Sequence, residues 1–467
     1  MSGLYTRFVS SVLFPLQERM KQHSTVADHA ALDRSQWLPT AQIRDIQSDR
    51  LRSLLTHAGI HVPYYRALFA RTGFDPAGVT SAADLQRLPF LTKAVIRANS
   101  DALRADDAQG LARFNTGGSS GEPLVFFIGR ERVSRDVAAK WRATRWWDVD
   151  IGDPEIVLWG SPIELGAQDR VKLLRDRLMR TRLLPAFDMS ASRVDHFMDV
   201  IRDTRPKMLF GYPSAFALIA SRAQERAVRL DDVGLKVAFV TSERLYPHQR
   251  ELIESVFGCP VANGYGGRDA GFIAHQCPAG SMHITAEDIV VEIVDGDGRV
   301  LPAGQSGEIV VTHLATRDYP FIRYRTGDVG VLSDQPCTCG RGLPVLAEVQ
   351  GRSTDFVVAA DGTVMHGLSL IYVLRDQPGV AAFRIEQESL AQTRVAVVPG
   401  EGFSAERSVP AIRKGLQDRL GSGVTIVIDL VDAIPAEASG KYRYVVSRVP
   451  VSGQAAPAPA AVEATHA

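Results

Sequence analysis

Residues 114–123, FNTGGSSGEP, combine three glycines with hydroxyl side chains. Glycine lets the backbone turn tightly and lets another molecule approach its N–H groups, which can then converge on an anion. Threonine and serine hydroxyls add further donors, so a phosphate group is the ligand that this loop suits. The candidate phosphate-binding residues are Thr116, Gly117, Gly118, Ser119, Ser120 and Gly121.

Two other motifs and an ordinary hairpin loop compete for this stretch. A Walker phosphate loop carries Lys and then Ser or Thr after its last glycine, whereas Gly121 is followed by Glu122 and Pro123. The pattern G-x-S-x-G also fits, which would make Ser119 the nucleophile of a serine hydrolase. That motif lies between a buried strand and a helix, but the preceding RFNT is polar and the following LVFFIG is typical of a strand. The hydrolase and the plain hairpin loop stay as alternatives.

The bulk composition limits the kind of partner. At 467 residues the chain exceeds one usual core, so two or three domains are expected. With 53 basic and 53 acidic residues the net charge is zero, which gives no electrostatic reason to expect nucleic acid or a membrane. A small molecule is the expected partner, with a homodimer as one option.

The N-terminal segment predicts neither a signal peptide nor a membrane span. No apolar run approaches the roughly 20 residues that cross a bilayer, and the start lacks a small-residue cleavage site. We therefore expect a cytoplasmic protein. The stretch LYTRFVSSVLFPL predicts an amphipathic packing helix rather than a membrane anchor.

Apolar periodicity predicts an α/β fold with a smaller α+β unit at the C-terminus. Residues 15–110 have helical periodicity, and residues 124–262 alternate strands with helices, which indicates layered sheets. Residues 283–333 predict a β meander, and an α+β unit follows. The expected domains are a large N-terminal domain (1–351), a small mobile C-terminal domain (352–450) and a disordered Ala/Pro-rich tail (451–467).

Five further stretches follow the glycine loop: TSERL (241–245), NGYGGRDAG (263–271), YRTGD (324–328), QGRSTD (350–355) and ASGKYRY (438–444). In this order they resemble the adenylate-forming acyl-CoA synthetase superfamily, and within it the phenylacetate–CoA ligase and capsule-biosynthesis-like branch. The resemblance covers about residues 40–450. Residues 61–76, HVPYYRALFARTGFDP, are similar to the lead-in of that branch.

The resemblance implies a role for each matched residue. The glycine loop would hold the β- and γ-phosphates of ATP, and Tyr265 with Gly266 would lie beside the adenine. Asp328 would accept both ribose hydroxyls, which a carboxylate can do at once; a plain turn residue is the alternative. Arg352 would contact the sugar and the phosphate. Lys441 would swing in during adenylation, when a mobile ammonium can offset the anions that come together; an exposed turn lysine is the alternative.

Two positions depart from the family's pattern. The family has a glutamate that holds magnesium where this chain has Asp269, which is shorter by one methylene, so Mg²⁺ would have to shift or bind through water. A helix cap is the other interpretation of Asp269. The hinge between the domains is expected within Ser353–Asp355, and Thr354 stands where the family usually has an acidic residue or lysine.

Three cysteines and one histidine suit a tetrahedral zinc site. They are Cys277, His283, Cys337 and Cys339. Spacing alone does not bring the two pairs together, and unrelated thiols are the alternative. Some members of the resembled branch have a structural zinc at such cysteines, so Zn²⁺ is expected here. Cys259 is expected in the core.

The resemblance predicts an ATP-dependent, AMP-forming ligase. It would activate an aromatic carboxylic acid as an acyl adenylate and transfer it to coenzyme A. Transfer to an amine, or activation of another oxyanion, stays as an alternative. Phe210, Tyr212 and Gly264 are the candidate residues of the acid pocket, although aromatic residues more often belong to a core.

Overall fold

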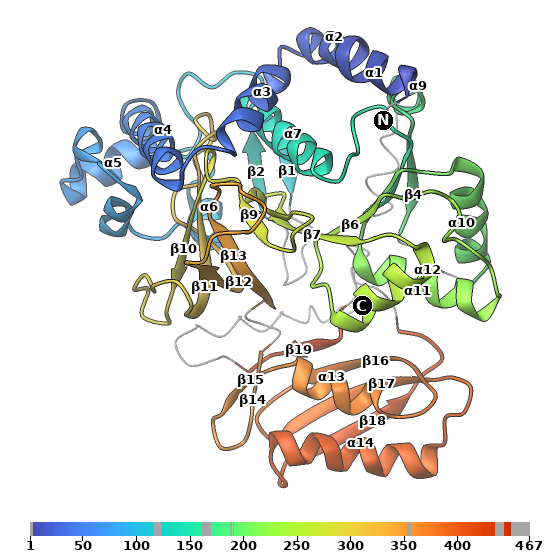
Figure 1. Cartoon of the computed structure of the whole chain (residues 1–467). Helices are drawn as coiled ribbons and strands as arrows, with labels where there is room; N and C mark the ends of the chain where they lie inside the picture. The colour runs from blue at the N-terminus through green and yellow to red at the C-terminus, as the bar shows by residue number, and fades with distance from the viewer. Residues whose placement is uncertain are drawn as a thin grey trace, which may run out of the picture.

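The chain forms a mixed α/β structure with one large sheet and a smaller C-terminal domain, shown as a computed structural model in Figure 1. This confirms the predicted fold class. The structure describes residues 3–115, 124–159, 170–186, 189, 191–352, 356–434 and 443–449. Within these ranges no helix has the length and apolar character that crossing a bilayer requires.

The first hundred residues are mostly helical, as their periodicity predicted. Their elements are α1 (Leu4–Phe8), η1 (Val9–Leu13), α2 (Phe14–Met20), α3 (Thr25–Ser35), α4 (Thr40–His61), α5 (Pro63–Thr72), η2 (Pro76–Gly78), η3 (Ala82–Arg87) and α6 (Lys93–Ala98). The segment η1 is π-helical. Local sequence sets the limits of α5, because Pro63 suits a first helical turn and Gly73 ends the helix with a φ of 65°.

Eleven described strands form one sheet in the order β10-β11-β12-β13-β9-β8-β7-β6-β5-β3-β4. Its parallel part contains β3 (Glu155–Trp159), β4 (Thr181–Pro185), β5 (Met208–Gly211), β6 (Val237–Thr241) and β7 (Val261–Gly267). The accompanying helices are α7 (Arg130–Arg145), α9 (Arg170–Met179), α10 (Ala191–Thr204), α11 (Pro213–Glu225) and α12 (Pro247–Phe257). Strands β5 and β6 are buried throughout, which explains apolar runs such as VAFVT.

The antiparallel part of the sheet contains the predicted meander. Its strands are β8 (Gly271–Gln276), β9 (Met282–Ile284), β10 (Ile289–Val294), β11 (Ser306–His313), β12 (Tyr324–Ser333) and β13 (Val345–Arg352). β10, β11 and β12 pair in succession. Their apolar side chains share one core with those of α4 and α5, so the N-terminal helices fix the position of the meander.

The C-terminal domain has its own sheet and core. The hairpin β14 (Phe356–Val358) and β15 (Val364–His366) leads to a sheet of order β18-β17-β16-β19. Its strands and helices are α13 (Leu368–Arg375), β16 (Val380–Gln387), β17 (Gln392–Pro399), α14 (Ala405–Leu420), β18 (Thr425–Leu430) and β19 (Val445–Ser447). The domain limits 1–351 and 352–450 stay a prediction, and the predicted tail lies outside the described residues.

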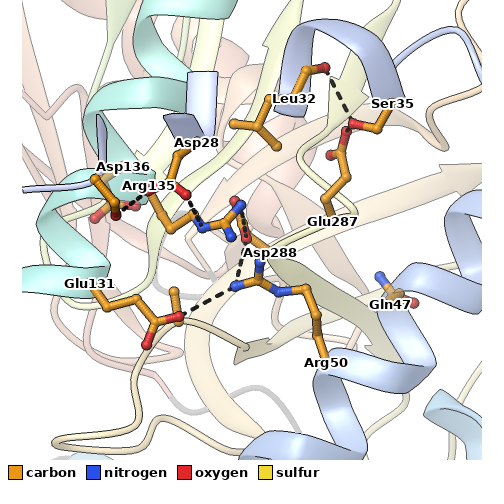
Figure 2. Close-up of polar contacts among 12 residues, drawn as sticks. Asp28, Leu32, Ser35, Gln47, Arg50, Glu131, Arg135, Asp136, Glu287 and Asp288 are labelled. Carbon is orange, nitrogen blue, oxygen red and sulfur yellow. Dashed lines mark hydrogen bonds and ion pairs between the residues drawn. The ribbon is translucent and has the colours of Figure 1, made fainter. Parts of the chain in front are cut away.

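Buried charges join the N-terminal helices to the meander, as Figure 2 shows. One oxygen of Asp288, the residue before β10, lies 3.0 Å from Nη2 of Arg50 and 3.6 Å from Nη1 of Arg135. Arg135 also lies 3.2 Å from Asp28 on α3. Burial raises the pKa of Asp288, and the two guanidinium groups oppose that rise. Because an unpaired buried charge is costly, this cluster fixes α3, α4 and α7 relative to β10.

Candidate functional site

The predicted glycine loop lies between two described strands. β1 (Ala112–Asn115) and β2 (Val125–Ile128) pair antiparallel, with Asn115 opposite Val125. Residues Thr116–Gly121 themselves lie outside the described residues. A strand follows the loop, as predicted, and α7 begins only at Arg130. A hydrolase elbow needs a helix directly after its serine, so this context disfavours Ser119 as a nucleophile.

The turn between β7 and β8 carries Asp269. Strand β8 returns antiparallel to β7 from Gly271. A Cβ atom on Gly266 would lie 2.4 Å from the carbonyl oxygen of Gly271, so this tight hairpin requires glycine at that position. Nη1 of Arg268 donates to the carbonyl oxygen of Asn115 at 3.2 Å. The Asp269 turn is therefore tied to the strand that enters the glycine loop.

Two tyrosine hydroxyls hold the two candidate carboxylates. The Tyr265 hydroxyl donates to Oδ2 of Asp328 at 2.9 Å, and the Tyr324 hydroxyl donates to Oδ2 of Asp269 at 2.6 Å. Burial, and then the charge of Asp328, raise the pKa of Tyr265, so its hydroxyl remains a donor at neutral pH. The fold thus joins the 263–271 and 324–328 motifs, although 63 residues separate Tyr265 from Asp328.

Asp328 and Arg352 are neighbours across two strands. Strands β12 and β13 pair so that these two residues stand opposite each other. The preceding Gly327 has a φ of 77°, a conformation that favours glycine, and the backbone N–H of Asp328 donates to Oγ1 of Thr326 at 3.0 Å. Of Arg352 the structure describes the backbone alone. The register therefore brings together the two positions that the resemblance assigns to the ribose.

Sequence reasoning missed the residues behind the Asp269 turn. Nη2 of Arg132 donates to the carbonyl oxygen of Arg268 at 2.8 Å. Oδ1 of Asp136 accepts from the backbone N–H of Phe272 at 3.3 Å and lies 3.3 Å from Nε2 of His313. Burial raises the pKa of Asp136, but the hydrogen bond from His313 and the charge of Arg132 lower it overall. No motif marks these residues, because the α7 sequence is typical of an ordinary charged helix.

The TSERL segment connects the parallel strands to β13. Ser242 has a φ of 70°, which is uncommon for a residue other than glycine. Oε2 of Glu243 accepts from the backbone N–H of Ser214 at 3.2 Å, at the first turn of α11, where a negative charge is favourable. Arg244 donates to the carbonyl oxygen of Gln350. The segment therefore bridges β6 and the strand that carries Arg352.

The three candidate residues of the acid pocket lie among aromatic side chains. Phe210 and Tyr212 are almost completely buried, and the ring of Trp159 lies 4.7 Å from that of Tyr212 and 6.0 Å from that of Phe210. A Cβ atom on Gly264 would lie 2.8 Å from the ring of Phe239. The burial of Phe210 and Tyr212 fits packing, so their part in binding an acid stays a prediction.

The C-terminal domain contacts the rest of the chain at Tyr246, which directly follows the TSERL segment. The ring of Tyr444 meets the ring of Tyr246 edge-on at 5.7 Å, and the guanidinium of Arg375 lies 5.1 Å above Tyr444. Lys441 and the predicted hinge Ser353–Asp355 lie outside the described residues. Tyr444, three positions after Lys441, nevertheless places this end of the domain against the large domain.

The fold brings the three cysteines and the histidine together. The four ligand atoms of Cys277, His283, Cys337 and Cys339 all lie within 4.8 Å of one another. Sγ of Cys277 is 3.7 Å from Sγ of Cys337, and Nε2 of His283 is 3.2 Å from Sγ of Cys339. Strand order explains the meeting, because β13 pairs with β9 and β9 pairs with β8.

The chemistry of this Cys/His cluster fits a tetrahedral zinc ion. Nδ1 of His283 lies 3.3 Å from the carbonyl oxygen of Leu343, which leaves Nε2 to face the thiols. Burial lowers the pKa of His283 to about 4, so the imidazole is neutral, as a ligand must be. Burial raises the pKa of Cys337, but hydrogen bonds from Ser281 and from the N–H of Cys339 lower it overall to about 7.

A second His/carboxylate group has a different character. His57, His61 and Asp107 also bring their polar atoms within 4.8 Å of one another. However, Nη2 of Arg317 lies 3.2 Å from Nδ1 of His57. Because a guanidinium can only donate, Nδ1 accepts and Nε2 carries the proton, facing Asp107 at 3.5 Å. Arg317 therefore occupies the ring nitrogen of His57 that is free of a proton, and we assign this group no ligand.

Two family models match the chain. An AMP-binding enzyme model matches residues 179–316, which include α10 to α12 and the Asp269 turn. A CapK C-terminal domain model matches residues 357–448, the smaller domain. The chain combines an AMP-binding domain with a CapK C-terminal domain. This arrangement confirms the predicted branch, and the assignment of the individual site residues remains a prediction.

Similar proteins agree with this assignment. A phenylacetate-coenzyme A ligase of Thermus thermophilus is 26% identical over 335 residues, covering 69% of this chain and 73% of that protein. Protein CapK of Staphylococcus aureus is 21% identical over 408 residues, covering 87% and 89%. A crystal structure of 2-hydroxyisobutyryl-CoA ligase in the postadenylation state has a TM-score of 0.72 and 23% identity, covering 89% of this chain and 91% of that one. The AMP-binding domain therefore has the adenylate-forming ligase fold.

Proposed function

We propose that the chain is an ATP-dependent, AMP-forming ligase that activates an aromatic carboxylic acid as an acyl adenylate and transfers the acyl group to coenzyme A. The hydrogen bond between Tyr265 and Asp328 carries the proposal, because it joins the two motifs that would enclose the adenosine. The related phenylacetate-coenzyme A ligases of Thermus thermophilus and Pseudomonas putida, 26% and 28% identical, support the acid and the acceptor.

In this proposal each residue has one task. The amides of the glycine loop hold the β- and γ-phosphates while the carboxylate of the acid attacks the α-phosphate. Asp328 accepts the ribose hydroxyls and Arg352 approaches from the opposite strand. Asp269, oriented by Tyr324, would hold Mg²⁺, which would offset charge on the phosphates. Pyrophosphate is the leaving group, and the acyl adenylate remains.

Lys441 completes the site from the smaller domain. Its ammonium would offset the charge that gathers when the carboxylate and the phosphates meet. The contact of Tyr444 with Tyr246 supports a position of this segment near the large domain. We propose the limits 1–351 and 352–450 for the two domains, with the hinge at Ser353–Asp355. A rotation there would exchange the adenylation face for the transfer face.

Transfer to an amine is the second candidate. The CapK relative aligns over 87% of this chain, whereas the phenylacetate-coenzyme A ligase of Pseudomonas putida aligns over 71%. The smaller domain also matches the CapK model. Because that domain would supply the face for the second half-reaction, transfer to an acceptor other than coenzyme A stays as the second candidate.

We also propose that Cys277, His283, Cys337 and Cys339 hold a structural zinc ion. Four protein ligands leave no open coordination position on the metal. The zinc ion would therefore link β8, β9 and the β12–β13 loop rather than take part in the reaction. Metal analysis of protein purified without chelator should give one zinc per chain, and Cys339→Ser should lose it. Cys259→Ala, at a buried cysteine outside the cluster, is the control. Zinc well below one per chain would contradict the proposal.

The reaction is tested by pyrophosphate exchange into ATP across a panel of aryl acids. Exchange should require the acid and Mg²⁺, and Lys441→Ala should abolish it. Lys414→Ala is the matched control, since Lys414 is an exposed lysine on α14 of the same domain. Mass spectrometry of products formed with coenzyme A or with amines then identifies the acceptor. Cleavage of an ester probe without any exchange would instead indicate the Ser119 hydrolase.

A further inference from the structure

The N-terminal helix has an exposed apolar stripe as well as a buried side. Leu4, Phe8, Val12, Leu16 and Met20 expose between 51% and 87% of their surface. On the other side of the helix, Val9 and Phe14 are buried, so the helix is already packed without the stripe. Soluble proteins rarely leave a contiguous row of large apolar side chains in water, and such a row marks an interaction site.

The backbone keeps these five residues aligned. In an α-helix a step of four residues overshoots one turn by about 40°, so a spacing of four drifts around the helix. The middle of this helix, η1 (Val9–Leu13), is π-helical and has wider turns, which offsets the drift. The stripe therefore runs along one side of α1, η1 and α2.

Helix α9 extends the apolar stripe sideways. The Tyr5 hydroxyl donates to the carbonyl oxygen of Leu178 at 2.8 Å, and the guanidinium of Arg180 lies 5.2 Å above the Tyr5 ring. Leu174 and Leu178 on α9 are exposed. Figure 1 shows α1 and α9 side by side at the end of the molecule opposite α14. We call the five stripe residues together with Tyr5, Leu174 and Leu178 the N-terminal face.

The chain around the N-terminal face is strongly basic. Residues 4–21 and 174–182 contain seven basic and two acidic residues, although the whole chain has a net charge of zero. The two acidic residues are both engaged: Glu18 is buried and accepts from the Thr25 hydroxyl, and Asp176 accepts from Nε of Arg175 at 2.8 Å. The exposed charge beside the apolar residues is therefore positive.

We propose that the N-terminal face docks on an anionic lipid bilayer. Apolar side chains would enter the boundary between headgroups and acyl chains, and the basic side chains would contact lipid phosphates. A second copy of the chain is disfavoured, because a two-fold interface would place this basic surface against itself. Docking is independent of the ligase reaction.

Vesicle flotation tests the proposal with the full chain. The wild-type protein should float with phosphatidylcholine vesicles in which about a third of the lipid is phosphatidylglycerol, and at least about tenfold less with phosphatidylcholine alone. High salt should weaken flotation, because exposed charges are screened. Phe8→Ser with Leu16→Ser should reduce it by more than about tenfold. Arg19→Gln with Arg177→Gln should reduce it on the anionic vesicles alone.

The matched controls change the same residue types elsewhere. Leu218→Ser with Leu390→Ser replaces two exposed leucines outside the N-terminal face, and Arg229→Gln with Lys414→Gln removes two exposed basic groups. Both pairs should float like the wild type, and thermal unfolding should verify that every variant folds. Equal flotation on the two vesicle types, or no loss in the Phe8/Leu16 variant, would overturn the proposal. A dimer in light scattering that this variant dissociates, without vesicle binding, would also overturn it.

Discussion

The proposed contact of Asp328 with the ribose gives the sharpest prediction from the site. Asp328→Asn keeps the shape of the side chain but replaces one acceptor oxygen with a donor. A hydrogen bond to a charged acceptor contributes about 1.5–3 kcal/mol, so AMP should bind about 10- to 150-fold more weakly. Tyr265→Phe should weaken AMP binding by less, about 0.5–1.5 kcal/mol, because it removes only the donor that orients the Asp328 carboxylate and keeps the aromatic ring. Both changes act on one carboxylate, so their effects should not add.

Calorimetry with AMP and with 2′-deoxy-AMP isolates this contact. The wild type should prefer AMP, and Asp328→Asn should lose most of that preference. Asp297→Asn, at an exposed aspartate in the turn between β10 and β11, is the control and should bind like the wild type. If folded Asp328→Asn bound AMP with unchanged affinity and kept its preference over 2′-deoxy-AMP, the assignment of the nucleotide site would be refuted.

Three further changes test other parts of the structure. Tyr324→Phe removes the donor to Asp269, so the Mg²⁺ concentration for half-maximal exchange should rise about tenfold in a metal titration. Gly266→Ala places a methyl group 2.4 Å from the carbonyl oxygen of Gly271, and thermal unfolding should show that the free energy of unfolding falls by about 1–3 kcal/mol. Burial, and then the charge of Arg145, lower the pKa of His29 from 6.5 to about 4 in the folded protein. As the pH falls, the imidazole of the unfolded chain is therefore protonated before that of the folded protein, which favours unfolding. Stability should drop by up to about 3 kcal/mol between pH 6.5 and pH 4, and His29→Phe should reduce that drop in unfolding measured across pH.

Local patterns predicted the elements well and their long-range contacts poorly. Periodicity identified the helical first hundred residues, the parallel strands and the meander, because burial on one face leaves a repeating signal. The resemblance placed Tyr265 and Asp328 at one nucleotide, but no local pattern encodes their direct hydrogen bond. Tyr324 lies inside the YRTGD motif, yet its contact with Asp269 depends on how β12 lies against the β7–β8 turn.

The Cys/His cluster is a second case in which local sequence patterns do not predict a long-range contact. The sequence supplied the ligand set, but the gap between His283 and Cys337 gave no reason for them to meet. Their meeting follows from the pairing of Val345 on β13 with His283 on β9, and pairing between distant strands has no local signature. Asp136 and Arg132 were missed because a charged residue on a helix usually faces solvent.

The N-terminal helix shows that the net charge of the whole chain does not describe each of its surfaces. The sequence predicted a packing helix, and Val9 and Phe14 do pack. A net charge of zero suggested no membrane partner, but charge summed over 467 residues does not describe one face. The exposed side of the helix became visible only when the structure placed α9, with its basic residues, next to Tyr5.

The acyl adenylate itself is the most direct test of the proposed ligase reaction. The protein should be mixed with ATP, Mg²⁺ and aryl acids in the absence of any acceptor, quenched, and examined by mass spectrometry. We predict an acyl adenylate in an amount close to that of the enzyme, together with pyrophosphate, and none with Lys441→Ala. Release of ADP and phosphate, or the absence of adenylate with every acid while AMP still binds, would rule out the proposed adenylation.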